Sequence, residues 1–198
     1  MHDVIAESRA LVTDKRLHIP GHHFDTMCRA TELCKIEMSM LGLLSVHPLG
    51  LVLEELFIPP QIVGASHTQI EASDIGNIQT SLLNRGVIKP GATDKFLRFA
   101  WHSHVDMKAT MSVPDRQTFT SLGGNGTALD PAWYISMVMN RQEEYEVIYD
   151  QWQPVRAVID ITDKTIIGDP TFADSALLGR IRQFVKLGRQ TIVGGKHV

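Results

Sequence analysis

The longest uncharged apolar stretch of the sequence runs from Met38 to Leu53, and a Pro-Leu-Gly triplet at residues 48–50 interrupts it. A helix that crosses a membrane needs roughly 20 consecutive apolar residues, so this stretch is too short and too broken to span one. It predicts instead a β-hairpin whose strands, Ile36–Val46 and Leu51–Ile58, pair antiparallel. We therefore expect no membrane-spanning segment and no membrane partner.

The other apolar segments show the periods of strands or helices and are bounded by turn residues. Because helices precede and interrupt the run of strands, the predicted fold class is α+β, with a mostly antiparallel sheet flanked by helices. Residues 1–163 are expected to form this domain, and residues 164–198 a C-terminal helical extension of it. Strands are predicted at Leu17–Ile19, Lys95–His104, Trp133–Asn140, Tyr145–Trp152 and Val155–Thr162, and helices at Phe24–Lys35, Ser73–Asn84, Pro114–Ser121 and Phe172–Leu187.

The charges of the chain nearly cancel, with 19 basic and 22 acidic residues and no block of like charge. A nucleic-acid-binding surface needs a basic patch, so we expect no nucleic-acid partner. The first residues lack the basic and apolar regions of a secretory signal, and a cytoplasmic location is therefore expected. Cys28 and Cys34 lie on different faces of a predicted helix, so we expect buried free thiols rather than a disulfide or zinc ligands.

Two histidines, His102 and His104, stand two residues apart at the end of the strand predicted at Lys95–His104. Side chains two apart in a strand point to the same side, so both imidazoles can reach one metal ion. Two imidazoles and a carboxylate, with a fourth position open to water, form the ligand set of a catalytic zinc ion. A His-x-His pair by itself is also common on surfaces and in cores, so the hypothesis depends on a third ligand.

Two aspartates can supply that third ligand. Asp115 falls in the first turn of the helix predicted at Pro114–Ser121, with Ser112 as the N-cap, and should face the end of the histidine strand. The Ser-x-x-Asp spacing is also that of an ordinary capping box. Asp106 shares strand parity with the two histidines, so spacing alone allows it in place of Asp115.

A zinc-bound water also needs a general base, and Glu37 is the candidate. It stands alone among apolar residues at the start of a predicted strand, where burying a carboxylate is costly and so suggests a function. The alternative is that Glu37 marks the solvent side of the strand's start. Glu54 and Glu55 are rival bases, but neighbours in a strand point to opposite sides, so one of them must face solvent.

The run around the two histidines resembles the signature of the JAMM (MPN-plus, or JAB) zinc metalloproteases. In that family a glutamate on an earlier strand precedes the signature by several tens of residues, and Glu37 holds that place. Many members have a glycine where this chain has Met40 and a proline where it has Val105, so the chain is most similar to divergent bacterial and phage-type members. The signature is matched without a gap by His102, Ser103 and His104, seven intervening residues, Ser112, two more residues and Asp115.

This resemblance implies a cytidine-deaminase-like layered domain that uses Zn²⁺ to hydrolyse a peptide or isopeptide bond. It implies that His102, His104 and Asp115 ligate the zinc ion. Glu37 would activate the bound water, and Ser112 would hydrogen-bond the oxyanion of the tetrahedral intermediate. The substrate that the family implies is a protein, cut at the C-terminus of a ubiquitin-like or sulfur-carrier-like domain.

Two other functions share this pattern of ligands. A chain that kept the fold but lost turnover would act as an interaction scaffold, although such relatives usually lack a ligand and all five expected residues are present here. A phage or mobile-element peptidase that processes a structural protein would use the same chemistry. A zinc nucleoside deaminase is excluded, because no Pro-Cys-x-x-Cys motif accompanies the histidines.

Overall fold

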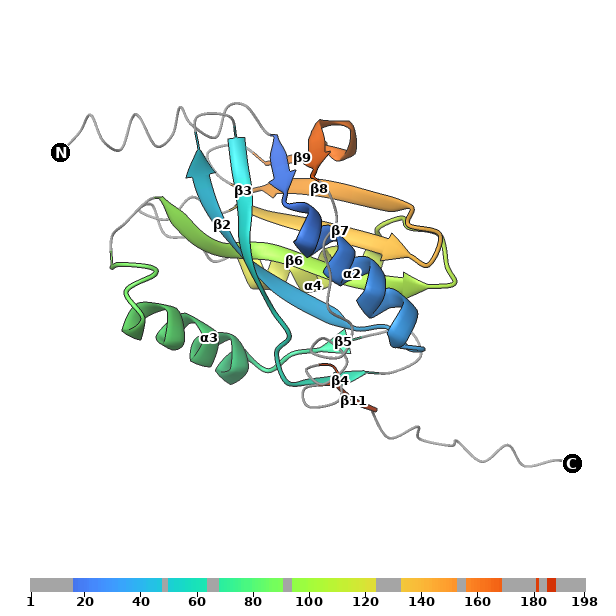
Figure 1. The fold of residues 1–198 in the computed structure, drawn as a ribbon, viewed down its shortest axis with the longest axis horizontal. Helices are drawn as coiled ribbons and strands as arrows, with labels where there is room; N and C mark the ends of the chain where they lie inside the picture. Colours follow the sequence, from blue (N-terminus) through green and yellow to red (C-terminus); the bar gives the residue numbers. More distant parts are fainter. Residues whose placement is uncertain are drawn as a thin grey trace, which may run out of the picture.

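An eight-stranded sheet in the order β10-β1-β3-β2-β6-β7-β8-β9 forms the centre of the fold (Figure 1). The computed structural model describes residues 16–47, 50–63, 68–90, 94–123, 133–152, 156–168, 181 and 185–187. The large sheet contains β1 (Leu17–Ile19), β2 (Ser39–His47), β3 (Gly50–Phe57), β6 (Lys95–Val105), β7 (Trp133–Asn140), β8 (Tyr145–Gln151), β9 (Ala157–Asp160) and β10 (Thr165–Ile167). A small second sheet, in the order β11-β4-β5, contains β4 (Gln61–Val63), β5 (Thr68–Gln69) and β11 (Val185–Leu187).

The large sheet is mixed. Four of its seven pairings are antiparallel, while β10 with β1, β1 with β3, and β6 with β7 are parallel. The predicted α+β class is confirmed, since α2 (Gly21–Leu33), α3 (Ala72–Asn84) and α4 (Val113–Gly123) accompany the sheet. β9 and β10 follow one another in the chain but occupy opposite edges of the sheet. Because only the short η1 helix (Thr162–Lys164) joins them, the sheet must curl so that its two edges come close together.

The hairpin predicted from the longest apolar stretch is present, and its strands β2 and β3 pair antiparallel. Gly50, at the start of β3, has a φ of 130°, which glycine adopts readily, and a Cβ there would lie 2.7 Å from the carbonyl oxygen of Arg16. This close approach lets the N–H of Leu51 donate to the same carbonyl at 2.9 Å, which aligns β1 beside β3. Among the described residues, no helix is long and apolar enough to cross a membrane.

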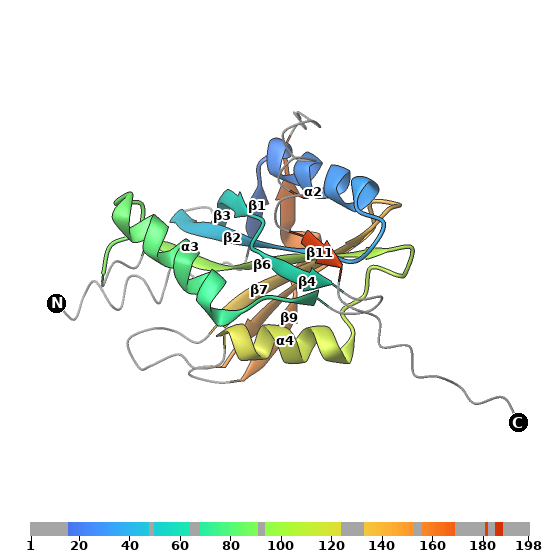
Figure 2. The ribbon, with the colours of Figure 1, turned by 90° about the horizontal axis from the view of Figure 1, so that it is seen from below.

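Both faces of the large sheet are covered. On one face, α2 packs against an apolar core that includes Trp101 of β6 and Met137 of β7. On the other face, a smaller core includes Ala100 and Val138 from the same two strands, and α4 lies over this side (Figure 2). Because side chains alternate along a strand, the even-numbered His102 lies on the face of Ala100, beneath α4.

The two cysteines are buried and form no disulfide, as predicted. Burial raises the pKa of the Cys28 thiol to about 12, so the thiol is not ionised near neutral pH. Its Sγ atom lies 3.8 Å from Sδ of Met139 in the core beneath α2. Cys28 and Cys34 therefore act as small apolar core residues.

Two described segments of residues 164–198 are strands, where a C-terminal helical extension was predicted. Thr165–Ile167 forms β10, which pairs parallel with β1 and so belongs to the large sheet. The helix predicted at Phe172–Leu187 is wrong at its end, because Val185–Leu187 forms β11 and pairs parallel with β4. The rest of that predicted helix lies outside the described residues, apart from the helical and buried Ile181. The backbone hydrogen bonds to the edge of β4 favour a strand at Val185–Leu187 more strongly than the spacing of its apolar residues favours a helix.

Candidate metal centre

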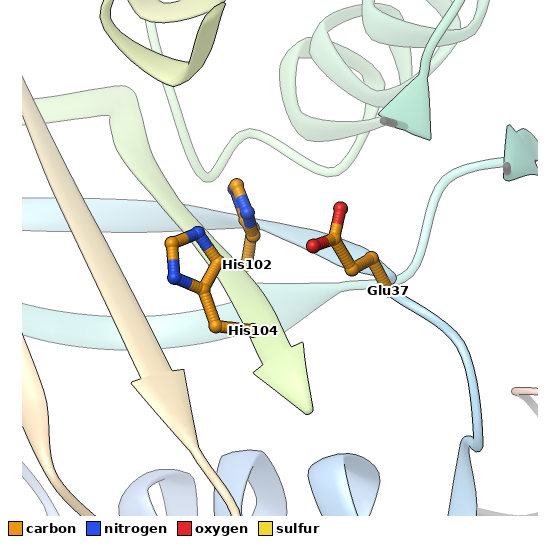
Figure 3. Close-up of side chains that lie close together, drawn as sticks. All are labelled: Glu37, His102 and His104. Atoms are coloured by element: carbon orange, nitrogen blue, oxygen red, sulfur yellow. The ribbon is translucent and has the colours of Figure 1, made fainter. Parts of the chain in front are cut away.

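Three buried side chains meet on the face of the large sheet that α4 covers (Figure 3). His102 and His104 come from β6, and Glu37 comes from the segment between α2 and β2. One ligand atom from each of the three lies within 4.8 Å of the other two. Side chains far apart in the sequence thus form a cluster that can hold a metal ion.

Asp115 joins this cluster from the first turn of α4. Its Oδ1 lies 3.4 Å from Nε2 of His102, and its Oδ2 lies 3.3 Å from Nε2 of His104. The carboxylate therefore faces both imidazoles at once, and both Nε2 atoms point towards it. The fold brings together all three residues predicted as metal ligands, and places Glu37 beside two of them.

Ser112 orients the Asp115 carboxylate through a capping box at the start of α4. The backbone N–H of Ser112 donates to Oδ2 of Asp115 at 2.8 Å, and its hydroxyl donates to the same oxygen. In return, the N–H of Asp115 lies 3.3 Å from Oγ of Ser112. The same hydrogen bonds therefore cap α4 and orient Asp115 towards the histidines. The two interpretations of the Ser-x-x-Asp spacing, as a capping box and as the source of a ligand, do not exclude each other.

The alternative ligand Asp106 lies outside the cluster. Its side chain is 73% exposed and pairs with Arg141 at 2.9 Å. The preceding residue, Val105, has a φ of 46°, and the register between β6 and β7 shifts between Ser103 and Val105. A positive φ at a β-branched residue ends the regular alternation of the strand, so parity no longer predicts where Asp106 points.

Ser103 and Gln61 hold Glu37 at the cluster by hydrogen-bonding the backbone of the two residues that follow it, Met38 and Ser39. The N–H of Met38 donates to Oγ of Ser103 at 3.0 Å, and the N–H of Ser103 donates back to the carbonyl of Met38 at 3.0 Å. On the other side, the buried amide of Gln61 accepts from the N–H of Ser39 at 2.7 Å and donates to its carbonyl at 2.9 Å. Glu37 is 4% exposed, so its interpretation as a solvent-facing strand start is wrong.

Ser103 and Gln61 have no role in the sequence prediction, although both position the predicted base. The only signal for Ser103 is its place between the two histidines, which puts its side chain on the opposite side of β6. Gln61 gives no local signal, because its contact with β2 depends on how the chain returns after β3. Its side-chain amide hydrogen-bonds both the N–H and the carbonyl of Ser39, as the backbone of a neighbouring strand would.

The rival bases Glu54 and Glu55 lie on β3 and take part in other contacts. Glu54 pairs with Lys95 at 2.5 Å, and Glu55 pairs with Arg85 at 3.2 Å. Both pairs are partly exposed to solvent, where such contacts contribute at most about 1 kcal/mol. Neither glutamate belongs to the cluster of Glu37 and the histidines.

The two histidines differ in their affinity for a proton. Burial lowers the pKa of His102 to about 4, although the Asp115 carboxylate works in the opposite direction. Burial also disfavours a proton on His104, but hydrogen bonds to Asp115 and to the carbonyl of Lys108 outweigh it and raise the pKa of His104. One imidazole is therefore neutral near pH 7, and the other gives up its proton less readily.

The two carboxylates also differ. Burial disfavours the charge of Asp115, but hydrogen bonds from His104 and Ser112 and the charge of His102 hold the pKa of Asp115 well below its usual range. Burial raises the pKa of Glu37, the neighbouring Asp115 charge adds to this effect, and His104 opposes it. Asp115 thus has the character of a permanent anion, as a ligand requires, and Glu37 that of a group able to gain a proton.

The donor atoms suit a divalent transition metal. Two imidazole nitrogens and a carboxylate oxygen are common ligands of Zn²⁺. Nδ1 of His104 lies 2.6 Å from the carbonyl oxygen of Lys108, so Nδ1 carries the hydrogen and Nε2 keeps its lone pair for a metal. The residues present therefore fit a metal ion with His102, His104 and Asp115 as ligands.

No protein-family model matches the chain. No curated protein sequence matches it either. Among solved structures, the chain is similar to the solution structure of protein DSY2949 from Desulfitobacterium hafniense, with a TM-score of 0.51 and 11% sequence identity, covering 77% of this chain and 93% of that chain. At this identity the similarity concerns the fold alone.

The affinity of this cluster for a divalent metal ion is expected to fall as the pH decreases. Metal ligands must be deprotonated, and His104 keeps its proton to a higher pH than an ordinary histidine, whereas His102 is neutral above about pH 4. Below the pKa of His104 the affinity should drop by roughly tenfold per pH unit, and above it the affinity should level off. Titration of Zn²⁺ as the probe metal, by calorimetry in buffers of different ionisation enthalpy, should show about one proton released per metal ion on the acid side. Release of none there would contradict the assignment.

Proposed function

We propose that the chain is a JAMM-type zinc metallopeptidase that hydrolyses a peptide or isopeptide bond. The observation that carries the proposal is the position of the Asp115 carboxylate, with one oxygen 3.4 Å from Nε2 of His102 and the other 3.3 Å from Nε2 of His104. These three side chains would hold the metal, and Glu37, which lies in the same buried cluster as the two histidines, would act beside them as the base. This division of roles is the one that the resemblance to the family implies.

When bound, the zinc ion would polarise the scissile carbonyl and lower the pKa of its water ligand to about 7. The Glu37 carboxylate would take up a proton from the attacking water and pass it to the departing amine. Its buried position supports this role, because burial raises the pKa of Glu37 and so favours the protonated form that the second step needs. A glutamate in open solvent would hold the proton less well.

Ser112 is proposed to hydrogen-bond the oxyanion of the tetrahedral intermediate. Its hydroxyl donates to Asp115 in the structure, so this role requires the hydroxyl to turn from the carboxylate towards the substrate. The backbone N–H of Ser112 also donates to Asp115, at 2.8 Å, and keeps the ligand oriented when the hydroxyl turns. An oriented donor of this kind contributes typically a few kcal/mol to transition-state stabilisation.

The proposed substrate is a protein with a ubiquitin-like or sulfur-carrier-like C-terminus, and the proposed setting is the cytoplasm. Both come from the resemblance to divergent bacterial and phage-type members of the family. The near balance of 19 basic and 22 acidic residues supports a protein rather than a nucleic-acid substrate.

A panel of ubiquitin-like fusions and isopeptide conjugates tests the proposal. The wild-type chain is expected to cleave at least one member, to lose this activity in a chelator that removes zinc, and to regain it when zinc is added back. Zinc binding without cleavage of any member would favour the interaction scaffold. Cleavage that persists without zinc would place the activity at another site.

A further inference from the structure

The segment from Val105 to Met111 joins the two halves of the metal centre. It begins directly after His104 with Val105, the last residue of β6, and ends directly before Ser112, which caps α4 and orients Asp115. Within this segment, the carbonyl oxygen of Lys108 lies 2.6 Å from Nδ1 of His104. The position of the segment therefore decides whether the ligands from β6 and from α4 can reach the same ion.

The turn between β7 and β8 holds the first half of this segment. The N–H of Arg141 donates to the carbonyl of Val105 at 3.0 Å, and Nδ2 of Asn140 donates to the carbonyl of Met107 at 3.2 Å. Oδ1 of the buried Asn140 also accepts from the N–H of Glu144 at 3.0 Å and so closes the turn itself. Substitution of Asn140 would disturb the turn together with the segment, so it cannot separate the two effects.

Glu146 of β8 holds the second half of the segment through a side-chain hydrogen bond. Its Oε2 accepts the hydrogen bond from the N–H of Met111 at 2.5 Å. His102 pairs with Val138 across β6 and β7, and Val138 pairs with Glu146 across β7 and β8. Residues directly paired across strands project to the same face, so Glu146 stands in one row with a metal ligand.

The strand alone gives no reason for a glutamate at this position. Its row neighbour Val138 is fully buried in an apolar core, which also contains the side chain of Met111, 5% exposed. A half-buried carboxylate beside such a core needs a hydrogen-bond donor, and the N–H of Met111 needs an acceptor just before the helix begins. Glu146 meets both needs, and in doing so it fixes the residue that precedes the N-cap.

We propose that Glu146 is a positioning residue of the metal centre. By fixing Met111, it places the capped start of α4 so that Asp115 reaches the ion held by His102 and His104. This inference rests on the proposed function, because it takes these three residues as the metal ligands. Glu146 acts through the backbone and does not itself bind the metal.

Zinc affinities of three Glu146 variants test this role. Glu146→Ala removes the acceptor of the Met111 N–H, and Glu146→Asp moves the carboxylate away from this N–H because its side chain is one methylene shorter. Both variants are expected to weaken zinc binding by roughly 10- to 100-fold. Glu146→Gln keeps an oxygen at the same reach and should bind zinc within a few-fold of wild type. Asp106→Ala, a change at an exposed residue of the same segment, is the control and should not alter the affinity. Competition with a chromogenic chelator measures zinc binding, and melting of the metal-free proteins measures their stability.

The outcomes separate this inference from the proposed function. A wild-type chain that binds no zinc overturns both. A chain whose affinity is the same with alanine, aspartate or glutamate at position 146 overturns the positioning role alone. Equal losses in the alanine and glutamine variants also overturn it, because glutamine retains the acceptor. If the alanine variant does not fold, the comparison of Glu146→Asp with Glu146→Gln carries the test.

Discussion

Replacement of Asp115 by alanine is expected to leave a folded chain that no longer retains zinc. Asp115 supplies the only negatively charged ligand of the proposed set, and it faces Nε2 of both His102 and His104. Without it, two imidazoles remain, whereas catalytic zinc sites generally have three protein ligands. After dialysis, elemental analysis should find about one zinc ion per wild-type chain and almost none in the variant.

Two control variants make this result specific. Asp106→Ala changes the other aspartate that strand parity allows, and because that side chain is 73% exposed it should keep its zinc. Asp115→Asn retains an oxygen that can accept the hydrogen bond from the N–H of Ser112, so it separates the loss of the charged ligand from the loss of this capping-box contact. Loss of zinc in the Asp106 variant but not in the Asp115 variants would reverse the assignment of the third ligand.

The long strands of the sheet and the short β1 could be predicted from the sequence, but β4, β5, β10 and β11 could not. The β2–β3 hairpin and β7 are long apolar runs bounded by turn residues, and burial dictates their residue types locally. β10 and β11 are three residues each, too short to show a period, and they form because β1 and β4 offer them partners. The mixed character of the sheet follows from such long-range pairings, which no local pattern encodes.

The ligands of the candidate site could be predicted because they depend on local geometry. His102 and His104 are neighbours on one strand, and Ser112 and Asp115 form one helix start. The choice between Asp106 and Asp115 could not be made from parity, since the positive φ of Val105 ends the regular strand just before Asp106.

The position of the predicted base depends on contacts between distant segments. Glu37 reaches the histidines because Ser103 pairs with Met38 on one side and Gln61 pairs with Ser39 on the other. These contacts join residues 65 and 22 positions apart in the chain. The cost of burying an isolated carboxylate singles out Glu37 in the sequence, and these contacts explain why it lies beside the two histidines.

Replacement of Glu37 by glutamine is expected to abolish hydrolysis while the chain keeps its zinc. Glutamine has nearly the same shape as glutamate and can still hydrogen-bond a water molecule, but it cannot take up a proton. Loss of a general base typically slows a reaction by about 10²- to 10⁴-fold, so kcat should fall by this factor on any substrate that the wild-type chain cleaves. The zinc content should remain that of the wild type, because the three proposed ligands are unchanged.

Zinc content and cleavage together decide the role of Glu37. The ligand atoms of Glu37, His102 and His104 lie within 4.8 Å of one another, so a site with Glu37 as the third ligand is the competing arrangement. If Glu37 is a ligand, Glu37→Gln would lose zinc and activity together. If Glu37 is the base, the variant would lose activity and keep its zinc. Glu54→Gln makes the same chemical change at an exposed glutamate paired with Lys95 and is expected to alter neither. Full activity in Glu37→Gln would remove Glu37 from the proposed mechanism.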